Sequence, residues 1–235
     1  ESEGRDRKNT DLPLDQKNLL KKIYDVNKNI VLILINGSTI SLPWANKHIP
    51  AIIEAWYPGQ SGGKAIAEVL FGDYNPGGKL PMTFYKGIND LPPFDDYDVR
   101  NGRTYMYFKG EPLYPFGHGL SYTDFKIKNV KPNNTNFSKS DTLQVTFNIV
   151  NVGSRYGSEV PQLYIEQNGI KKLKAFKRIF LNKDESLEST MKVAIKDFQS
   201  WNLIENNYVV KTGDYRIHLG TSSQDFVFTS NIKVN

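Results

Sequence analysis

The chain has 235 residues, enough for one large domain or two smaller ones, and its 39% apolar and 23% charged residues are ordinary for a globular protein. The absence of cysteine excludes disulfides, thiolate metal sites and a cysteine nucleophile. The net charge of +5 comes from scattered lysines rather than a basic stripe, so no nucleic-acid partner is expected, and no apolar run is long enough to predict a membrane span.

The first part of the chain alternates helical and strand patterns. Residues 14–27 place Leu19, Leu20, Ile23 and Tyr24 at helical spacing. Residues 30–35 form a continuous apolar run typical of a fully buried parallel strand. The elements expected after them are a helix over 42–47, a strand over 49–56, a helix over 63–71 and a strand over 80–84. This alternation predicts a partial α/β sandwich domain with a mostly parallel sheet over residues 1–84.

Residues 85–123 have little periodicity but many glycines, prolines and aromatic residues. We expect a connecting segment that packs against a surface. Its aromatic side chains are candidates either for core packing or for a sugar-binding site. They are Tyr97, Tyr105, Tyr107, Phe108, Tyr114 and Phe116.

After residue 124 the pattern changes to period two. Residues 141–152 alternate Leu143, Val145, Phe147 and Ile149 on one face. Further strands are expected over 160–167, 176–182, 187–195, 214–220 and 225–234. About seven short strands between turn residues predict an immunoglobulin-like or fibronectin-like sandwich over residues 124–235.

The run Gly59-Gln60-Ser61-Gly62-Gly63 matches the G-x-S-x-G pattern of a serine-hydrolase nucleophile elbow. In that interpretation Ser61 is the nucleophile, Asp73 or Asp95 the acid and His118 the base. The alternative is structural: Ser61 caps the helix that begins at Gly62, and the glycines allow close packing. Both interpretations are open on this pattern.

The N-terminal run ESEGRDR contains three acids and two arginines in seven residues. It is either a solvated terminus or a loop carboxylate held by arginines for acid/base chemistry, which requires a raised pKa. The three histidines, His48, His118 and His218, are isolated from one another and from other ligand types. No metal site is therefore expected.

Several motifs together resemble the C-terminal portion of a glycoside hydrolase family 3 enzyme, in its β-xylosidase/β-glucosidase branch. The resemblance covers essentially the whole chain, and it is specific because the motifs occur in the family's order and spacing. The motifs are EGRDR at 3–7, LP at 12–13 with Gln16 after it, YPGQSGG at 57–63, LFGDYNPGGKLP at 70–81, GRTY at 102–105 and YPFGHGLSYT at 114–123.

The resemblance implies three parts in the whole enzyme: a barrel domain with an Asp nucleophile, an α/β sandwich with the acid/base Glu, and a fibronectin type III-like domain. The family's acid/base residue matches Glu3, with Glu1 as second choice, and Ser61 then caps a helix. Arg7 and Tyr105 are the candidate substrate-binding residues. Arg5 or Arg7 either orders the loop or occupies a surface position. No cofactor is implied.

The implied reaction is retaining hydrolysis of a terminal β-linked xylose or glucose from an oligosaccharide or aryl glycoside. The expected partner is the barrel domain, without which we expect this chain to be inactive. We expect a periplasmic or secreted location, with any signal peptide in the missing N-terminal part. The alternatives from other classes are a non-catalytic scaffold or carbohydrate-binding module and, third, a serine esterase using Ser61.

Overall fold

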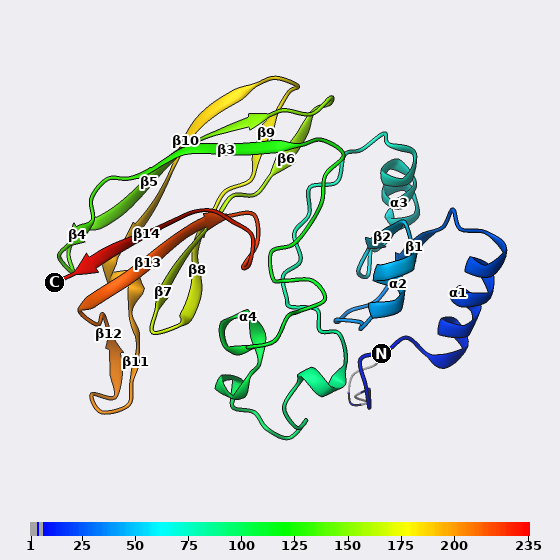
Figure 1. The fold of residues 1–235 in the computed structure, drawn as a ribbon, viewed down its shortest axis with the longest axis horizontal. Helices are drawn as coiled ribbons and strands as arrows, with labels where there is room; N and C mark the ends of the chain where they lie inside the picture. Colours follow the sequence, from blue (N-terminus) through cyan, green and yellow to red (C-terminus); the bar gives the residue numbers. More distant parts are fainter. Residues whose placement is uncertain (1–3, 5–6) are drawn as a thin grey trace. The chain divides into compact units, whose positions relative to one another are not determined.

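The structure is a computed structural model that describes Gly4 and residues 7–235. It divides into two compact units (Figure 1). Unit 1 comprises the described residues up to 74 together with 82–115, and unit 2 comprises 75–81 and 116–235. The expected connecting segment 85–123 is therefore shared: residues 85–115 pack in unit 1 and 116–123 in unit 2. In the described part of the chain, no helix combines the length and apolar character needed to cross a membrane.

Unit 1 is an α/β unit built on the parallel strand pair β1 and β2, in register Val31↔Ala51. The helices and strands expected between residues 14 and 71 are confirmed with small shifts at their ends. The unit also has two 3-10 turns, Ile88–Asp90 and Val99–Asn101, that the sequence did not suggest. Its elements are α1 (Leu14–Val26), β1 (Val31–Leu34), α2 (Pro43–His48), β2 (Ala51–Glu54), α3 (Gly62–Phe71) and α4 (Thr104–Tyr107).

The core of unit 1 lies between α1, α2 and the strand pair, and it includes Leu20, Leu34 and Ala45. The strands themselves are mostly half-exposed, so the expectation of fully buried strands was wrong. A parallel strand becomes buried when neighbouring strands and helices cover both its edges and faces. The described residues of unit 1 contribute only two strands to this sheet.

The strand expected over residues 80–84 does not form. Leu80 exchanges backbone hydrogen bonds with residues 117 and 118 in unit 2, whereas Phe84 pairs with Tyr114 in unit 1. Pro81 lies between them and has no N–H to donate to a ladder. The chain passes from unit 2 to unit 1 between residues 81 and 82, so the apolar run 80–84 does not form one continuous strand.

Unit 2 is the predicted all-β sandwich. One sheet has the order β10-β5-β3 and the other the order β4-β14-β13-β7-β8, and two further pairs, β6-β9 and β11-β12, complete it. The strands are β3 (Phe125–Pro132), β4 (Asn136–Phe137), β5 (Thr142–Asn151), β6 (Gly157–Glu159), β7 (Gln162–Gln167), β8 (Ile170–Phe176), β9 (Ile179–Leu181), β10 (Ser186–Ala194), β11 (Ser200–Asn202), β12 (Asn207–Val209), β13 (Gly213–Gly220) and β14 (Phe226–Val234).

The period-two pattern correctly identified the core face of β5, because Leu143, Val145, Phe147 and Ile149 are all fully buried. They pack with residues of the other sheet in one continuous core. Residues 124–235 are all described and contain twelve strands, more than the seven or so expected. The additional ones are short, edge or hairpin strands whose alternation is too brief or too polar to detect in the sequence.

Two segments from the motif-rich part of the chain pack within unit 2, and we call them together the clasp: residues 75–81 and 116–123. Asn75 joins them, because its side-chain oxygen accepts hydrogen bonds from the Ser121 hydroxyl (3.0 Å) and the Tyr122 N–H (2.7 Å). Its amide nitrogen donates to the Tyr156 carbonyl (2.9 Å). Asn75 thus links the two segments of the clasp to each other and to the sandwich.

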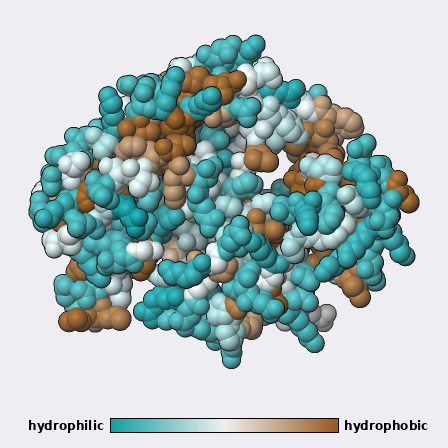
Figure 2. Space-filling view, in the orientation of Figure 1, coloured by the Kyte–Doolittle hydropathy of each residue, from teal (hydrophilic) through white to brown (hydrophobic). Residues whose placement is uncertain are grey.

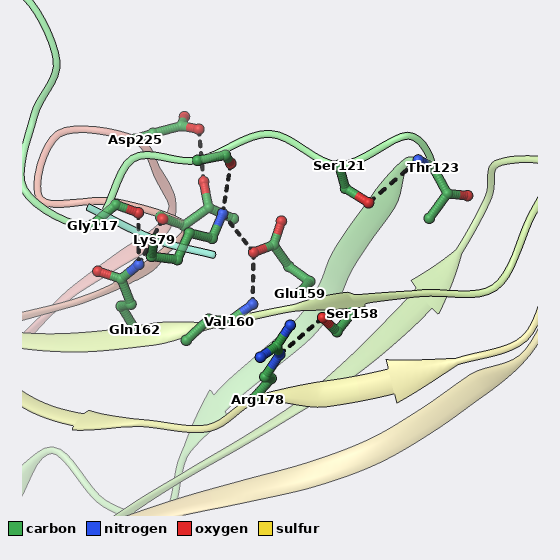
Figure 3. A network of polar contacts seen from close by, with 12 residues as sticks. Lys79, Gly117, Ser121, Thr123, Ser158, Glu159, Val160, Gln162, Arg178 and Asp225 are labelled. Carbon is green, nitrogen blue, oxygen red and sulfur yellow. Dashed lines mark hydrogen bonds and ion pairs between the residues drawn. The ribbon is translucent and has the colours of Figure 1, made fainter. Parts of the chain in front are cut away.

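Lys79 makes the main charged contact of the clasp (Figure 3). Its Nζ lies 2.7 Å from Glu159 Oε1, with only 12% and 13% of the two side chains exposed. It also donates a hydrogen bond to the Gly119 carbonyl at 2.9 Å. On the other segment, the Gly117 carbonyl accepts from Gln162 Nε2 at 3.1 Å.

The β11–β12 hairpin extends from the sandwich and has an apolar tip, visible as a brown cluster at the lower left of Figure 2. Leu203 and Ile204 at the turn are 76% and 95% exposed. Trp201 and Tyr208 face each other across the hairpin with ring centroids 5.2 Å apart. This local aromatic pair stabilises a hairpin that contributes little to the main core.

Candidate functional site

Two of the sequence-predicted catalytic candidates, Glu3 and Glu1, lie outside the described residues, as does Arg5. The described chain that follows them begins at Arg7, the second of the two arginines expected to order the loop. Arg7 and the elements that it contacts form the described part of the site.

Arg7 is attached to the turn that follows β1. Its Nη2 donates to Ser38 Oγ at 2.6 Å and to the Thr39 carbonyl at 2.8 Å. Both bonds come from one nitrogen, whose two N–H groups are held in the plane of the guanidinium group. Arg7 thus holds the N-terminal segment on the end of β1.

The segment remains attached over the next residues. The Ser41 N–H donates to the Thr10 carbonyl at 2.8 Å, and Asp11 forms a parallel bridge with Ser41. The Ser41 hydroxyl donates to the Tyr85 carbonyl at 2.9 Å, so the Thr10 hydroxyl, 2.6 Å away, is the donor to Ser41. Residues 7–11 therefore run alongside residues 38–41.

The turn after β1 is also connected to the end of β2. Asn36 Nδ2 donates to the Ser38 carbonyl at 2.6 Å and more weakly to Glu54 Oε2 at 3.4 Å. Glu54 Oε1 accepts from the Trp56 N–H at 3.2 Å. Trp56 has φ of +53°, a left-handed conformation that is strained for a bulky residue. Such strain clusters at functional sites.

Asn36 is only 7% exposed, and its Oδ1 has no hydrogen-bond partner among the described residues, Gly4 and 7–235. An unsatisfied buried acceptor costs about 1–3 kcal/mol, so a donor at this position stabilises the unit. Asn36 and Glu54 lie at the carboxyl ends of two parallel strands. That edge is where open α/β sheets place ligands and catalytic groups.

The sequence reasoning missed Asn36, Ser38 and Glu54 as site residues. The available signal was positional: Asn36 follows one predicted parallel strand, and Glu54 ends the next. Polar residues at these two ends meet at one edge of a parallel sheet. Ser38 had no comparable signal, because its role depends on the distant Arg7.

Tyr105, the other predicted substrate-binding residue, lies half-buried on α4. Several aromatic residues of the middle segment have packing contacts: Phe108 meets Tyr85 edge-on with centroids 5.0 Å apart. Tyr114 packs on Phe84, and its hydroxyl donates to Asn46 Oδ1 at 2.7 Å. The packing alternative is thus supported for Phe108 and Tyr114.

Ser61 occupies the N-cap position of α3, but its side chain makes no capping hydrogen bond, so the predicted cap contact is absent. The Gly62 N–H donates to the Gly59 carbonyl at 3.2 Å, and Ser61 has φ −92° and ψ 14°. These are the dihedrals of the third residue in an ordinary type I turn. The geometry gives no sign of the strained turn of a nucleophile elbow.

His118, the base of the serine-hydrolase hypothesis, belongs to the clasp in unit 2. Burial lowers the pKa of its imidazole, and the positive charge of Lys79 lowers it further. His118 is thus held mainly neutral in a structural segment. Within the described residues, no group of three or more His, Asp or Glu side chains is arranged to hold a metal ion.

Comparisons with known proteins agree with this architecture. Residues 1–122 match the model of the glycosyl hydrolase family 3 C-terminal domain, and residues 159–223 match that of a fibronectin type III-like domain. A xylan 1,4-beta-xylosidase of Xylanibacter ruminicola is 39% identical over 94% of this chain, which covers 26% of that protein. A periplasmic beta-glucosidase of Salmonella typhimurium is 32% identical over 94% of this chain, which covers 31% of it.

A solved structure gives the same result. The chain superposes on a GH3 beta-glucosidase of Bifidobacterium adolescentis with a TM-score of 0.88 at 34% identity, over 99% of this chain and 37% of that one. The chain thus spans about a quarter to a little over a third of these relatives. Because more than half of its residues match the family's C-terminal domain, and the fibronectin-like unit follows in order, the chain belongs to glycoside hydrolase family 3.

Proposed function

We propose that this chain is the acid/base-bearing C-terminal part of a retaining, exo-acting β-glycosidase that removes terminal β-linked xylose or glucose. Glu3 is the general acid/base, and the nucleophilic Asp lies on a barrel domain outside these 235 residues. The observation that carries the proposal is the attachment of residues 7–11, which begin four positions after Glu3, to the carboxyl edge of the β1–β2 pair. The named relatives support the substrate class.

The reaction proceeds in two steps. In the first, the Asp carboxylate forms a bond to the anomeric carbon while the glycosidic bond breaks, and Glu3 gives its proton to the leaving oxygen. In the second, a water oxygen bonds to the anomeric carbon, the Asp–sugar bond breaks, and Glu3 takes the water's proton. Retaining glycosidases place their two carboxyl groups about 5–5.5 Å apart, and the acid of the first step serves as the base of the second.

The barrel domain is the partner that this function requires, and the chain alone releases no product. The test is nitrophenol release from aryl β-xyloside and aryl β-glucoside by the purified chain. Clear turnover by the chain alone would contradict the division of catalytic groups between two domains.

We also propose a periplasmic or secreted location, which the periplasmic relative supports.

The catalytic assignment is tested in the full-length enzyme with Glu3→Gln and Ser61→Ala. Glu3→Gln is expected to abolish hydrolysis of substrates with poor leaving groups, because a neutral amide neither protonates the leaving oxygen nor activates water. Ser61→Ala is expected to retain activity, since Ser61 makes no capping bond. Loss with Ser61→Ala alone would favour the esterase, and no loss with either variant would favour a non-catalytic scaffold or carbohydrate-binding module.

A further inference from the structure

Resting on the proposed role of Glu3, we propose that Arg7 is a positioning residue for the acid/base step, acting through its bonds to the turn after β1. The strands fix this turn independently of Arg7. Asn36 closes the turn through the Ser38 carbonyl and also reaches Glu54 at the end of β2. Arg7 therefore binds to an already ordered acceptor site, Ser38 Oγ and the Thr39 carbonyl.

Covalent geometry sets what these bonds do for Glu3. Four residue steps separate Glu3 from Arg7, which keeps the two Cα atoms within about 14 Å. If the Arg7 bonds are lost, the next attachment is Thr10, and seven steps allow about 25 Å. Lengthening the tether in this way lowers the effective concentration of the Glu3 carboxyl group at its site roughly two- to fivefold.

Orientation adds to this tether effect. A displacement of 1 Å in a catalytic group costs on the order of 100-fold in rate. We therefore expect loss of both Arg7 bonds to reduce the acid-catalysed step by about 10- to 100-fold. A positioning role predicts an effect on the steps that need the Glu3 proton, because the Arg7 bonds act on the segment that carries Glu3. A direct contact between Arg7 and the sugar would instead lower kcat/KM for every substrate.

The experiment compares two substrates in the full-length enzyme: a phenyl glycoside, whose leaving group needs a proton, and a 2,4-dinitrophenyl glycoside, whose leaving group does not. The variant Arg7→Met is expected to lower kcat/KM about 10- to 100-fold for the phenyl glycoside and less than about threefold for the other. Arg7→Lys is expected to fall between Arg7→Met and the parent, since an ammonium group keeps the charge and the donors but ends one atom short of the Nη2 that makes both bonds. Lys8→Met, one exposed charge removed from the next position, is the matched control and is expected to behave as the parent.

Ser38→Ala is the second variant, because it removes only the hydroxyl acceptor and leaves the Thr39 carbonyl. It is expected to give the same substrate selectivity, with a smaller loss of about three- to tenfold. Hydrogen exchange of residues 38–41 is expected to be unchanged in Arg7→Met, which shows that the turn itself stays folded.

The outcomes separate this proposal from the one on which it rests. Equal losses for both substrates in Arg7→Met and Ser38→Ala would overturn the positioning role and indicate a structural one. Parent-like behaviour of both variants, with Glu3→Gln still selective for the phenyl glycoside, would also overturn it while leaving the acid/base assignment intact. Glu3→Gln without that selectivity would instead contradict the proposed function.

Discussion

The ion pair between Lys79 and Glu159 provides the sharpest stability prediction, because both side chains are nearly buried (Figure 3). Lys79→Met removes the charge while keeping an apolar chain of similar length. Glu159 then keeps one hydrogen bond, from the Val160 N–H at 2.6 Å, but loses its counter-ion. The Gly119 carbonyl also loses its donor.

Breaking a buried ion pair by removing one partner costs about 3–5 kcal/mol. The lower end applies here, because each side chain retains some exposure to water, 12% and 13%. A loss of about 3 kcal/mol raises the unfolding equilibrium constant by roughly 100- to 200-fold. With a urea m-value of about 1.5–2 kcal/mol/M for a unit of this size, the unfolding midpoint falls by about 1.5–2 M.

The assay is urea unfolding of the whole chain, monitored by hydrogen-exchange mass spectrometry. Peptides from β5, β7 and β13 report on unit 2 alone. Lys183→Met is the matched control. Its pair with Asp184 is also in unit 2, but the atoms are 4.0 Å apart and the side chains 61% and 76% exposed. The midpoint in this control is expected to shift by less than about 0.3 M.

The double variant Lys79→Met, Glu159→Met separates the charge effect from lost packing. Replacing a whole buried pair with apolar side chains is often neutral, so we expect recovery of at least about 1 kcal/mol relative to Lys79→Met. The reasoning is refuted if Lys79→Met shifts the midpoint no more than Lys183→Met does. It is refuted equally if the double variant is less stable than Lys79→Met.

Two further predictions concern glycine packing and pH. Gly119→Ala is expected to destabilise unit 2 by about 1–3 kcal/mol, because the added Cβ would collide with the rigid Gly78 carbonyl oxygen. Gly63→Ala is the control, because open space surrounds Gly63 in α3. It is expected to be neutral or stabilising by up to about 1 kcal/mol. Thermal unfolding of both variants checks this, and equal effects would contradict it. Burial lowers the pKa of His218 despite its contact with Glu166. Below pH about 6.5 the unfolded chain therefore binds a proton that the folded chain does not. The free energy of unfolding falls as the pH drops from 6.5 towards the lowered pKa. Urea midpoints at pH 7 and 5.5 are expected to differ less in His218→Asn than in the parent, and an undiminished difference would contradict the assignment.

The candidate site was only partly accessible to sequence reasoning. The run ESEGRDR indicated a loop with acids and arginines, but its anchoring partner Ser38 lies 31 positions beyond Arg7. No local pattern encodes a bond between such distant residues. Ser61 illustrates the opposite error: its position at a helix start predicted a capping bond, yet the side chain makes none. A local preference does not decide which hydrogen bonds the surrounding backbone geometry allows.

The sequence by itself determined the order of elements, the α/β character of the first part and the sandwich of the second. Hydrophobic periodicity is a local property, and it correctly identified the buried face of β5 and the helices α1 and α3. Only the tertiary structure decided where the motif-rich segments belong. The sequence placed residues 75–81 in the α/β part, but they pack in unit 2, where Asn75 and Lys79 find partners 81 and 80 positions away. Such assignments depend on which buried polar groups satisfy one another in space, and that pairing has no signature along the chain.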